Sequence, residues 1–205
     1  MIAIIDYDAG NLKSVEKAFG ALDQECVITG DGRKILAADR VVLPGVGAFG
    51  AAMEQLRQRG LDQVIREVVW QKKPFLGICL GMQLLFEGSE ENGGAEGLGL
   101  LGGAIRKIPE CDGLKIPHIG WNSLELRNHG RLFQGIKGSP YVYFVHSYYL
   151  KARDEEIVKA VTQYSANIHA SVEKENIFAC QFHPEKSSGV GLRILANFAK
   201  VQGGA

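Results

Sequence analysis

The chain has 205 residues, 46% hydrophobic and 22% charged, which is typical of a soluble globular protein and suits a single domain over residues 1–205. Its 23 Lys and Arg balance 23 Asp and Glu, so the charge pattern predicts no nucleic-acid partner and no membrane partner. With no apolar run long enough to span a bilayer, no basic flank at Met1 and four sparse cysteines, we expect a reduced, cytoplasmic protein.

The first part of the chain alternates short apolar runs with helical patterns. We expect helices at 12–21 and 53–70, the second interrupted at Gly60, and strands at 2–5, 25–29, 40–43 and 73–78. Continuous apolar strands separated by helices predict an α/β fold whose mostly parallel central sheet carries helices on both faces. Ligands of such sheets bind beyond the carboxyl ends of the strands.

The pattern changes after Gly103. Strands with hairpin-like links are expected at 104–108, 141–145, 157–162 and 177–180, and an amphipathic helix at 190–201. These runs predict a smaller antiparallel element beside the parallel sheet. Residues 87–99 are rich in glycine and acidic residues, and we expect a surface loop there.

A cysteine flanked by glycines follows the strand predicted at 73–78. In Gly77-Ile78-Cys79-Leu80-Gly81, a glycine stands two residues before and two residues after the thiol. This spacing favours a sharp strand-to-helix turn that exposes a nucleophile at the start of a helix, where the helix dipole stabilises a thiolate. A buried structural cysteine between two closely packed glycines is the alternative.

An imidazole and a carboxylate stand two residues apart near the C-terminus. If 177–180 is a strand, His183 and Glu185 leave its carboxyl end together. A cysteine nucleophile needs a histidine base, and that histidine needs a group that orients its second nitrogen. Cys79, His183 and Glu185 are therefore the candidate catalytic residues. A solvated turn histidine and half of a metal site with Cys180 are alternatives, although no second Cys/His pair has ligand spacing, so no metal is predicted.

Two glycines close the strand at 40–43. Acyl chemistry needs donors where negative charge develops on the carbonyl oxygen, and the N–H groups of Val46 and Leu80 are candidates for this oxyanion role. Gly45 and Gly47 also allow a phosphate-binding loop. The segment lacks the third glycine of a dinucleotide motif and the Lys-Ser/Thr of a P-loop.

Together these segments resemble the class I (triad) glutamine amidotransferases. Within that family the resemblance is greatest to the glutaminase subunits of imidazole glycerol phosphate synthase, and it covers nearly the whole chain. The segments that carry it are 5–12, 43–49, 77–85, 117–122, 143–149 and 181–186. Asp8 and Gly102 depart from the residues usual there, a glycine and a proline, and neither belongs to the candidate catalytic set.

The resemblance implies a class I amidotransferase fold and a glutaminase that forms a glutamyl thioester on Cys79. It implies that Gly47, Gln83 and the backbone of Ser147 and Tyr148 bind L-glutamine, and that no cofactor is used. Gln83 lies one helical turn after Cys79 and can face the same pocket. His146 has no carboxylate at the spacing of His183 and Glu185, so we interpret it as structural.

The resemblance also implies a partner, a cyclase subunit with a (β/α)8 barrel that receives the ammonia as a heterodimer. It places Asn11, Trp121 and Lys186 near that interface. Other functions remain open: a different amidotransferase subunit, as in anthranilate or p-aminobenzoate synthesis; a regulatory module with a vestigial site; and a cysteine peptidase or γ-glutamyl hydrolase.

Overall fold

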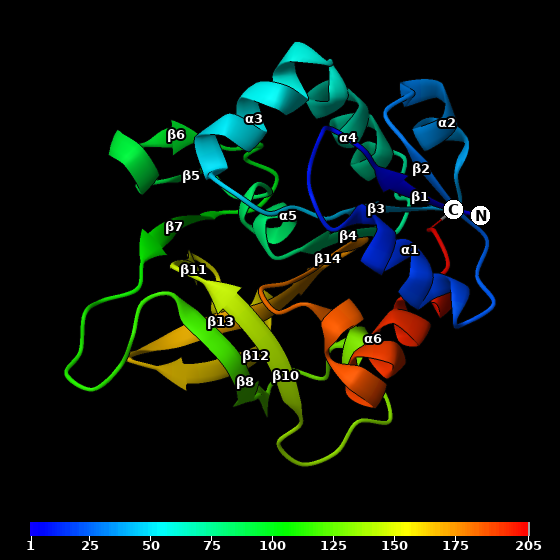
Figure 1. Cartoon of the computed structure of the whole chain (residues 1–205). Helices are drawn as coiled ribbons and strands as arrows, with labels where there is room; N and C mark the ends of the chain where they lie inside the picture. The colour runs from blue at the N-terminus through cyan, green and yellow to red at the C-terminus, as the bar shows by residue number, and fades with distance from the viewer. Residues whose placement is uncertain (205) are drawn as a thin grey trace.

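The computed structural model describes residues 1–204 and is built around an eight-stranded sheet with the order β2-β1-β3-β4-β14-β13-β12-β9 (Figure 1). The first five strands of this order are parallel, and β13, β12 and β9 extend the sheet antiparallel. The strands are β1 (Ile2–Ile5), β2 (Cys26–Thr29), β3 (Arg40–Leu43), β4 (Phe75–Ile78), β9 (Glu125–Leu126), β12 (Val158–Tyr164), β13 (Ala166–Lys174) and β14 (Ile177–Cys180). The predicted mostly parallel α/β sheet is confirmed.

Helices cover both faces of this sheet. Along β1, Ala3 and Ile5 join one hydrophobic cluster with α2, α3 and α4, whereas Ile2 and Ile4 join a second cluster with α1 and α6 (Figure 1). The helices are α1 (Leu12–Gly20), α2 (Gly32–Ala37), α3 (Phe49–Gln58), α4 (Leu61–Trp70), α5 (Leu80–Gln83) and α6 (Ser188–Lys200), with 3-10 turns at Glu91–Gly93, Arg131–Phe133, Glu155–Ile157 and Pro184–Lys186. None of the helices in residues 1–204 is long and apolar enough to cross a bilayer.

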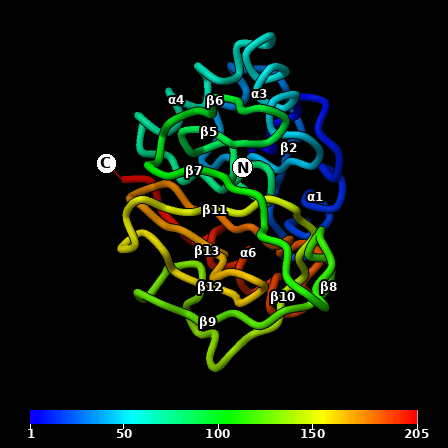
Figure 2. Tube along the Cα trace, turned by 90° about the vertical axis from the view of Figure 1, so that its left-hand side faces the viewer, coloured from blue at the N-terminus to red at the C-terminus, as the bar shows by residue number. Residues whose placement is uncertain are grey.

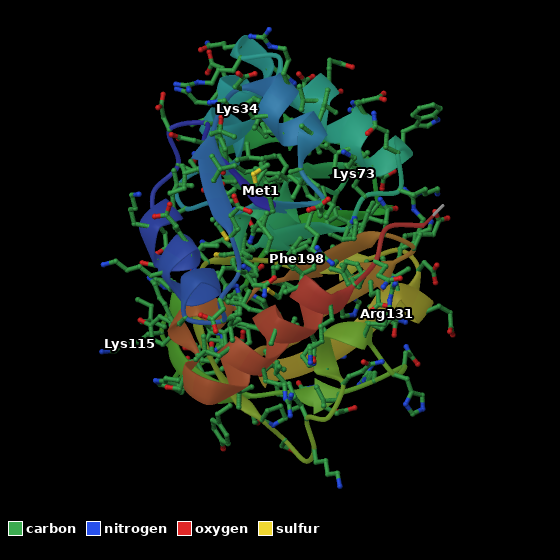
Figure 3. The ribbon with its side chains drawn as sticks, turned by 90° about the vertical axis from the view of Figure 1, so that its right-hand side faces the viewer. Met1, Lys34, Lys73, Lys115, Arg131 and Phe198 are labelled. Carbon is green, nitrogen blue, oxygen red and sulfur yellow. The ribbon has the colours of Figure 1, made fainter. Side chains whose placement is uncertain are left out.

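Aromatic side chains fix α6 against the sheet. Phe198, labelled in Figure 3, is fully buried, and its ring centroid lies 5.9 Å from that of Phe178 on β14 and 6.4 Å from that of Phe19 on α1. Such aromatic pairs add about 0.5–1.5 kcal/mol beyond the area that they bury. These contacts hold β14 and α6, the two elements on either side of the turn after β14, against each other.

Two smaller sheets account for the change of pattern after Gly103. One pairs β8 (His118–Ser123) with β10 (Tyr141–His146) antiparallel, and Figure 2 shows β8 beside β10. The other has the order β11-β7-β5-β6, with β11 (Tyr148–Ala152), β7 (Gly103–Lys107), β5 (Gly88–Ser89) and β6 (Ala95–Glu96). The antiparallel element is confirmed, although β8, β11 and β13 were not predicted from the sequence.

Two local predictions are wrong. Residues 87–99 are not a plain loop, because β5, a 3-10 turn and β6 lie there, and a Cβ at Gly97 would stand 2.2 Å from the Phe86 carbonyl oxygen. The helix expected from residue 53 begins at Phe49, since the Glu91 carboxylate accepts a hydrogen bond of 2.7 Å from the Phe49 N–H. A side chain 42 residues away caps this helix, so no local signal marks its start.

Candidate active site

Cys79 occupies a strained turn between β4 and α5. Its φ of 54° and ψ of −111° lie outside the regions that most residues adopt, and its N–H donates to the Cys180 carbonyl at 2.8 Å. The flanking glycines are required, because a Cβ at Gly77 would stand 2.7 Å from the Gly81 carbonyl oxygen and one at Gly81 would stand 1.8 Å from that of Leu43. The helix that follows, α5, is a single turn of four residues.

The turn after β14 carries the other two candidate catalytic residues. The His183 side chain is 1% exposed and that of Glu185 is fully buried, and Nδ1 of His183 lies 2.6 Å from Oε1 of Glu185. The same Oε1 accepts a hydrogen bond of 2.5 Å from the Asn11 side-chain amide. Asn11 has a φ of 74°, so the loop before α1 is bent to bring it here. Sequence reasoning assigned Asn11 to an interface and missed this contact.

The electrostatic surroundings of His183 favour its charged form. Burial by itself lowers the pKa of His183, but contacts with Cys79 and Glu185 and the charges of both outweigh it and raise the pKa to about 9. Nε2 of His183 makes no hydrogen bond of ordinary geometry, so its proton is free to move to or from a reacting group. The raised pKa keeps the His183 imidazole charged at neutral pH.

The strand end at Pro44–Gly47 lies over the Cys79 turn. The Tyr7 hydroxyl donates to the Pro44 carbonyl at 3.1 Å, and Gly47 has a φ of 100° that only glycine adopts readily. Within residues 1–204, neither the Val46 N–H nor the Leu80 N–H donates to a protein acceptor. Both remain available as donors to a ligand.

A cavity of about 310 Å³ joins these parts, a volume at the lower end of the range that small-molecule sites occupy. It is lined by Val46, Gly47, Cys79, Leu80, Gln83, Glu91, Pro117, Val145, His146, Ser147, Tyr148 and His183. All the predicted oxyanion and substrate-binding residues therefore meet at one cavity with Cys79 and His183. A larger, open hollow of about 870 Å³ adjoins it along the loop at 110–116 and shares only Ser147 and Tyr148 with it.

Two lining residues differ from the sequence interpretation. Gln83 does not have a free amide, because its Nε2 donates to the Tyr148 carbonyl and to Oε1 of Gln181, both at 2.9 Å. Glu91 was not predicted at all, since it stands in the segment taken for a surface loop. Its Oε2 caps the Phe49 N–H, and it is the one carboxylate among the residues that line the cavity in the described chain.

His146, which lines the cavity, forms a buried pair with His118. Nδ1 of His146 lies 2.9 Å from the Tyr148 carbonyl, to which it must donate, and its Nε2 lies 3.1 Å from Nδ1 of His118. His118 stacks on Tyr164 with the ring centroids 3.9 Å apart. Burial lowers the pKa of His118 to about 4, and burial together with the charges of His118 and His183 lowers that of His146 to about 3 despite the Tyr148 contact. Both rings are neutral at pH 7.

This neutral pair predicts acid sensitivity. Between about pH 6.5 and 5 the unfolded chain binds protons at both histidines and the folded protein does not, so the free energy of unfolding falls as the pH falls. At about 1.4 kcal/mol per pH unit and group, the loss at pH 5 is about 4 kcal/mol. Urea unfolding across this range measures it. The variant His118→Gln should reduce the slope by about 1.4 kcal/mol per pH unit, the contribution of one group, and the exposed His129→Gln should not, and an unchanged slope in His118→Gln would contradict the assignment.

The predicted interface residues lie outside the cavity. Trp121 is 51% exposed, and Ile119 and Tyr141 are each 59% exposed. The register of β8 with β10 puts Ile119 and Trp121 opposite Val145 and Tyr143, so these side chains share the outer face of the two-stranded sheet. Lys186 is exposed and follows Glu185 directly.

Comparisons with known proteins identify the family of this chain. The family described as glutamine amidotransferase class-I matches residues 3–201. The imidazole glycerol phosphate synthase subunit HisH of Moorella thermoacetica is 50% identical over 200 residues, which cover 98% of this chain and 94% of that protein. The HisH of Methanocaldococcus jannaschii is 47% identical over 201 residues, covering 98% of this chain and 100% of that protein.

Solved structures show the same fold at low sequence identity. A crystal structure of a glutamine amidotransferase superposes with a TM-score of 0.75 at 18% identity, covering 97% of this chain and 100% of that one. The PurLQS structure from Thermotoga maritima gives a TM-score of 0.76 at 20% identity, covering 97% and 96%. The fold, the family match and the identity to HisH subunits lead to one conclusion: this chain belongs to the class I glutamine amidotransferases and, within them, to the HisH subunits of imidazole glycerol phosphate synthase.

Proposed function

We propose that this chain hydrolyses L-glutamine to glutamate through a Cys79–His183–Glu185 triad and passes the ammonia to a cyclase subunit. That subunit, a (β/α)8 barrel, would use the ammonia to make imidazole glycerol phosphate and an aminoimidazole carboxamide ribotide in histidine biosynthesis. The observation that carries the proposal is the placement of a strained cysteine and a buried His183–Glu185 pair at one small cavity.

The reaction uses the proton that His183 already holds at neutral pH. The Cys79 thiolate attacks the side-chain amide carbon of glutamine, and the His183 imidazolium gives its proton to the departing ammonia, which leaves a glutamyl thioester. His183 then takes a proton from water as the water attacks the thioester, and glutamate leaves as the thiolate is restored. Glu185, held by Asn11, orients the imidazole and stabilises its charge.

The unused backbone donors fit the oxyanion role. Leu80 follows the nucleophile directly, and its N–H has no protein acceptor within the described chain. Val46 lines the same cavity, and its N–H is likewise unused there. Two such donors aimed at the developing oxyanion contribute about 10²–10³-fold each to the rate.

Glutamine itself carries an ammonium and a carboxylate that need partners. We assign the ammonium to Glu91, whose Oε1 makes no hydrogen bond in the described part of the protein while Oε2 caps α3. Gln83, through its Oε1, Gly47 and the backbone of Ser147 and Tyr148 complete the contacts with the amino acid.

Glu91→Gln should raise the KM for glutamine about ten-fold and leave kcat within about three-fold. The reason is that a charge-assisted hydrogen bond to the ammonium, worth about 1.5–3 kcal/mol, becomes a neutral one far from the reacting amide. Steady-state glutamate release measures both constants. Glu96→Gln, an exposed carboxylate on β6, is the matched control and should behave as wild type. A fall in kcat with KM unchanged would remove Glu91 from ammonium binding.

The outer face of the β8–β10 sheet suits the cyclase partner. It exposes Ile119, Trp121 and Tyr141 close to the cavity, since Val145 on the same face lines that cavity. Exposed aromatic residues in such a patch are typical interface anchors. Asn11 and Lys186 lie beside the triad carboxylate and extend this surface toward α1.

The test is glutamate release from L-glutamine by the chain alone and with the cyclase subunit. We expect release that increases with the cyclase present, and conversion of the cyclase substrate when glutamine is the only nitrogen source. Preference for γ-glutamyl peptides over free glutamine would instead indicate a γ-glutamyl hydrolase. Absence of any glutamate release, with the cyclase and its substrate present, would contradict the proposal.

A further inference from the structure

Gln181 lies beside the nucleophile, one residue beyond the end of β14. The parallel register of β14 with β4 pairs Cys180 with Ile78, so the next residues, Gln181 and Cys79, leave the sheet edge next to each other. The Gln181 N–H donates to the Ala170 carbonyl at 2.8 Å, and its side chain is fully buried. A buried side-chain amide needs hydrogen-bond partners for both its oxygen and its NH₂ group.

Those partners fix the orientation of the amide. Nε2 of Gln83 donates to the Tyr148 carbonyl at 2.9 Å and, through its second hydrogen, to Oε1 of Gln181 at 2.9 Å. The Tyr148 carbonyl can only accept, so the NH₂ group of Gln83 must face it, and the same NH₂ group then needs an acceptor on Gln181. Gln181 therefore turns its Oε1 toward Gln83, and its own NH₂ group is directed at the Cys79 sulfur, 3.6 Å away.

The direction of this contact distinguishes the two forms of Cys79. A thiol can donate to the Val145 carbonyl, which lies 4.0 Å from the sulfur. A thiolate can only accept, and an N–H···S⁻ contact is stronger than one to a neutral sulfur. Hydrogen bonding to the charged form of a group favours that form.

We propose that Gln181 is a further catalytic residue, which donates a hydrogen bond to the Cys79 thiolate and restrains it for attack, and that Gln83 is the positioning residue that aims the Gln181 amide. This inference rests on the proposed function, because it assigns a role within the same site. It also gives Gln83 a second task besides contact with glutamine.

The other groups around the sulfur do not replace this donor. Tyr7 and Cys180 both lie close enough to Cys79 for its charge to act on them. Burial, and then the charge of Cys79, raises the pKa of Tyr7. Burial, and then the charges of Glu185 and Cys79, raises the pKa of Cys180. Both stay neutral, and Glu91 and Glu185 bring negative charge near the cavity. Within the described structure, the Gln181 amide is the side-chain group that donates a hydrogen bond to the Cys79 sulfur.

The experiment is alkylation of Cys79 by iodoacetamide as a function of pH, followed on the peptide that holds Cys79 by mass spectrometry. The full chain is used without glutamine, as wild type, Gln181→Met, Gln181→Glu and Gln83→Met. Gln181→Met keeps the side-chain volume and removes the donor, and we expect the pH midpoint of the alkylation rate to rise by about one unit, which is a ten-fold loss in rate at pH values below both midpoints. Gln181→Glu should raise the pH midpoint further, and Gln83→Met should raise it by less than Gln181→Met does.

The matched control is Asn197→Leu on α6, whose buried amide donates to the Leu132 and Gln134 carbonyls, both at 2.9 Å. It should lower thermal stability and leave the Cys79 midpoint unchanged. An unchanged midpoint in folded Gln181→Met would overturn the proposal, and if that variant does not fold, an unchanged midpoint in Gln181→Glu does so. Glutamate release by wild type with its partner is measured separately, so a failure of the glutaminase assignment remains distinct from a failure of the Gln181 role.

Discussion

Cys79→Ala should abolish glutamine-dependent synthesis by the complex, a loss of more than about 10⁴-fold, while synthesis from added ammonium salts continues at the wild-type rate. Among the described residues that line the cavity, Cys79 alone carries a sulfur that can form the thioester, and removing the nucleophile of a catalytic unit eliminates almost all of its contribution. In the proposed division of labour, the cyclisation belongs to the partner subunit and needs only ammonia. The measurement is product formation with each nitrogen source.

The buried Cys180 supplies the control for this prediction. Cys180→Ala removes a neighbouring sulfur that does not line the cavity and should retain most glutamine-dependent activity. Equal loss of glutamine-dependent and ammonia-dependent synthesis in Cys79→Ala would mean that the variant disrupts the complex rather than ammonia production, and the division of labour between the two subunits would be wrong.

His183→Ala should lower kcat for glutamine hydrolysis by about 10²–10⁴-fold. Without the imidazole, the leaving ammonia has no proton donor and the attacking water has no base, although the oxyanion donors and the thiol remain. Because these groups are intact, residual activity should exceed that of Cys79→Ala. Steady-state glutamate release by the complex measures the effect.

A second buried histidine tests whether this loss is specific. His169 is 5% exposed and accepts a hydrogen bond from the Ala152 N–H, away from the cavity. His169→Gln should reduce stability with little change in kcat. A comparable loss of kcat in both variants would show that packing around histidine, rather than proton transfer by His183, limits the reaction.

Local spacing was enough to predict the thiol, the imidazole and the carboxylate of the candidate catalytic set. The turn at Cys79 depends on glycines within two residues of the thiol, and His183 and Glu185 leave one strand end together, so neighbours in sequence decide both features. The parallel order of β1, β3 and β4 likewise follows from alternating apolar runs and helices.

What sequence reasoning missed depends on contacts between distant segments. Asn11 reaches Glu185 across 174 residues, and Glu91 caps α3 from a segment whose glycines suggested a loop. β8 was missed because its pattern is reversed, with polar His118 and Asn122 directed inward and Ile119 and Trp121 outward. Gln181 could have been noticed, since Gln181, His183 and Glu185 alternate after β14, but its donor direction depends on Gln83 and Tyr148.

The most direct test of the central claim is capture of the glutamyl thioester. The complex is incubated with isotopically labelled glutamine and the cyclase ligand, quenched in acid and digested, and the peptides are searched for label. We predict a glutamyl adduct on the peptide that contains Cys79, sensitive to hydroxylamine and absent from Cys79→Ala. Turnover of glutamine with no adduct on that peptide, or an adduct on Cys26, Cys111 or Cys180 instead, would contradict the account.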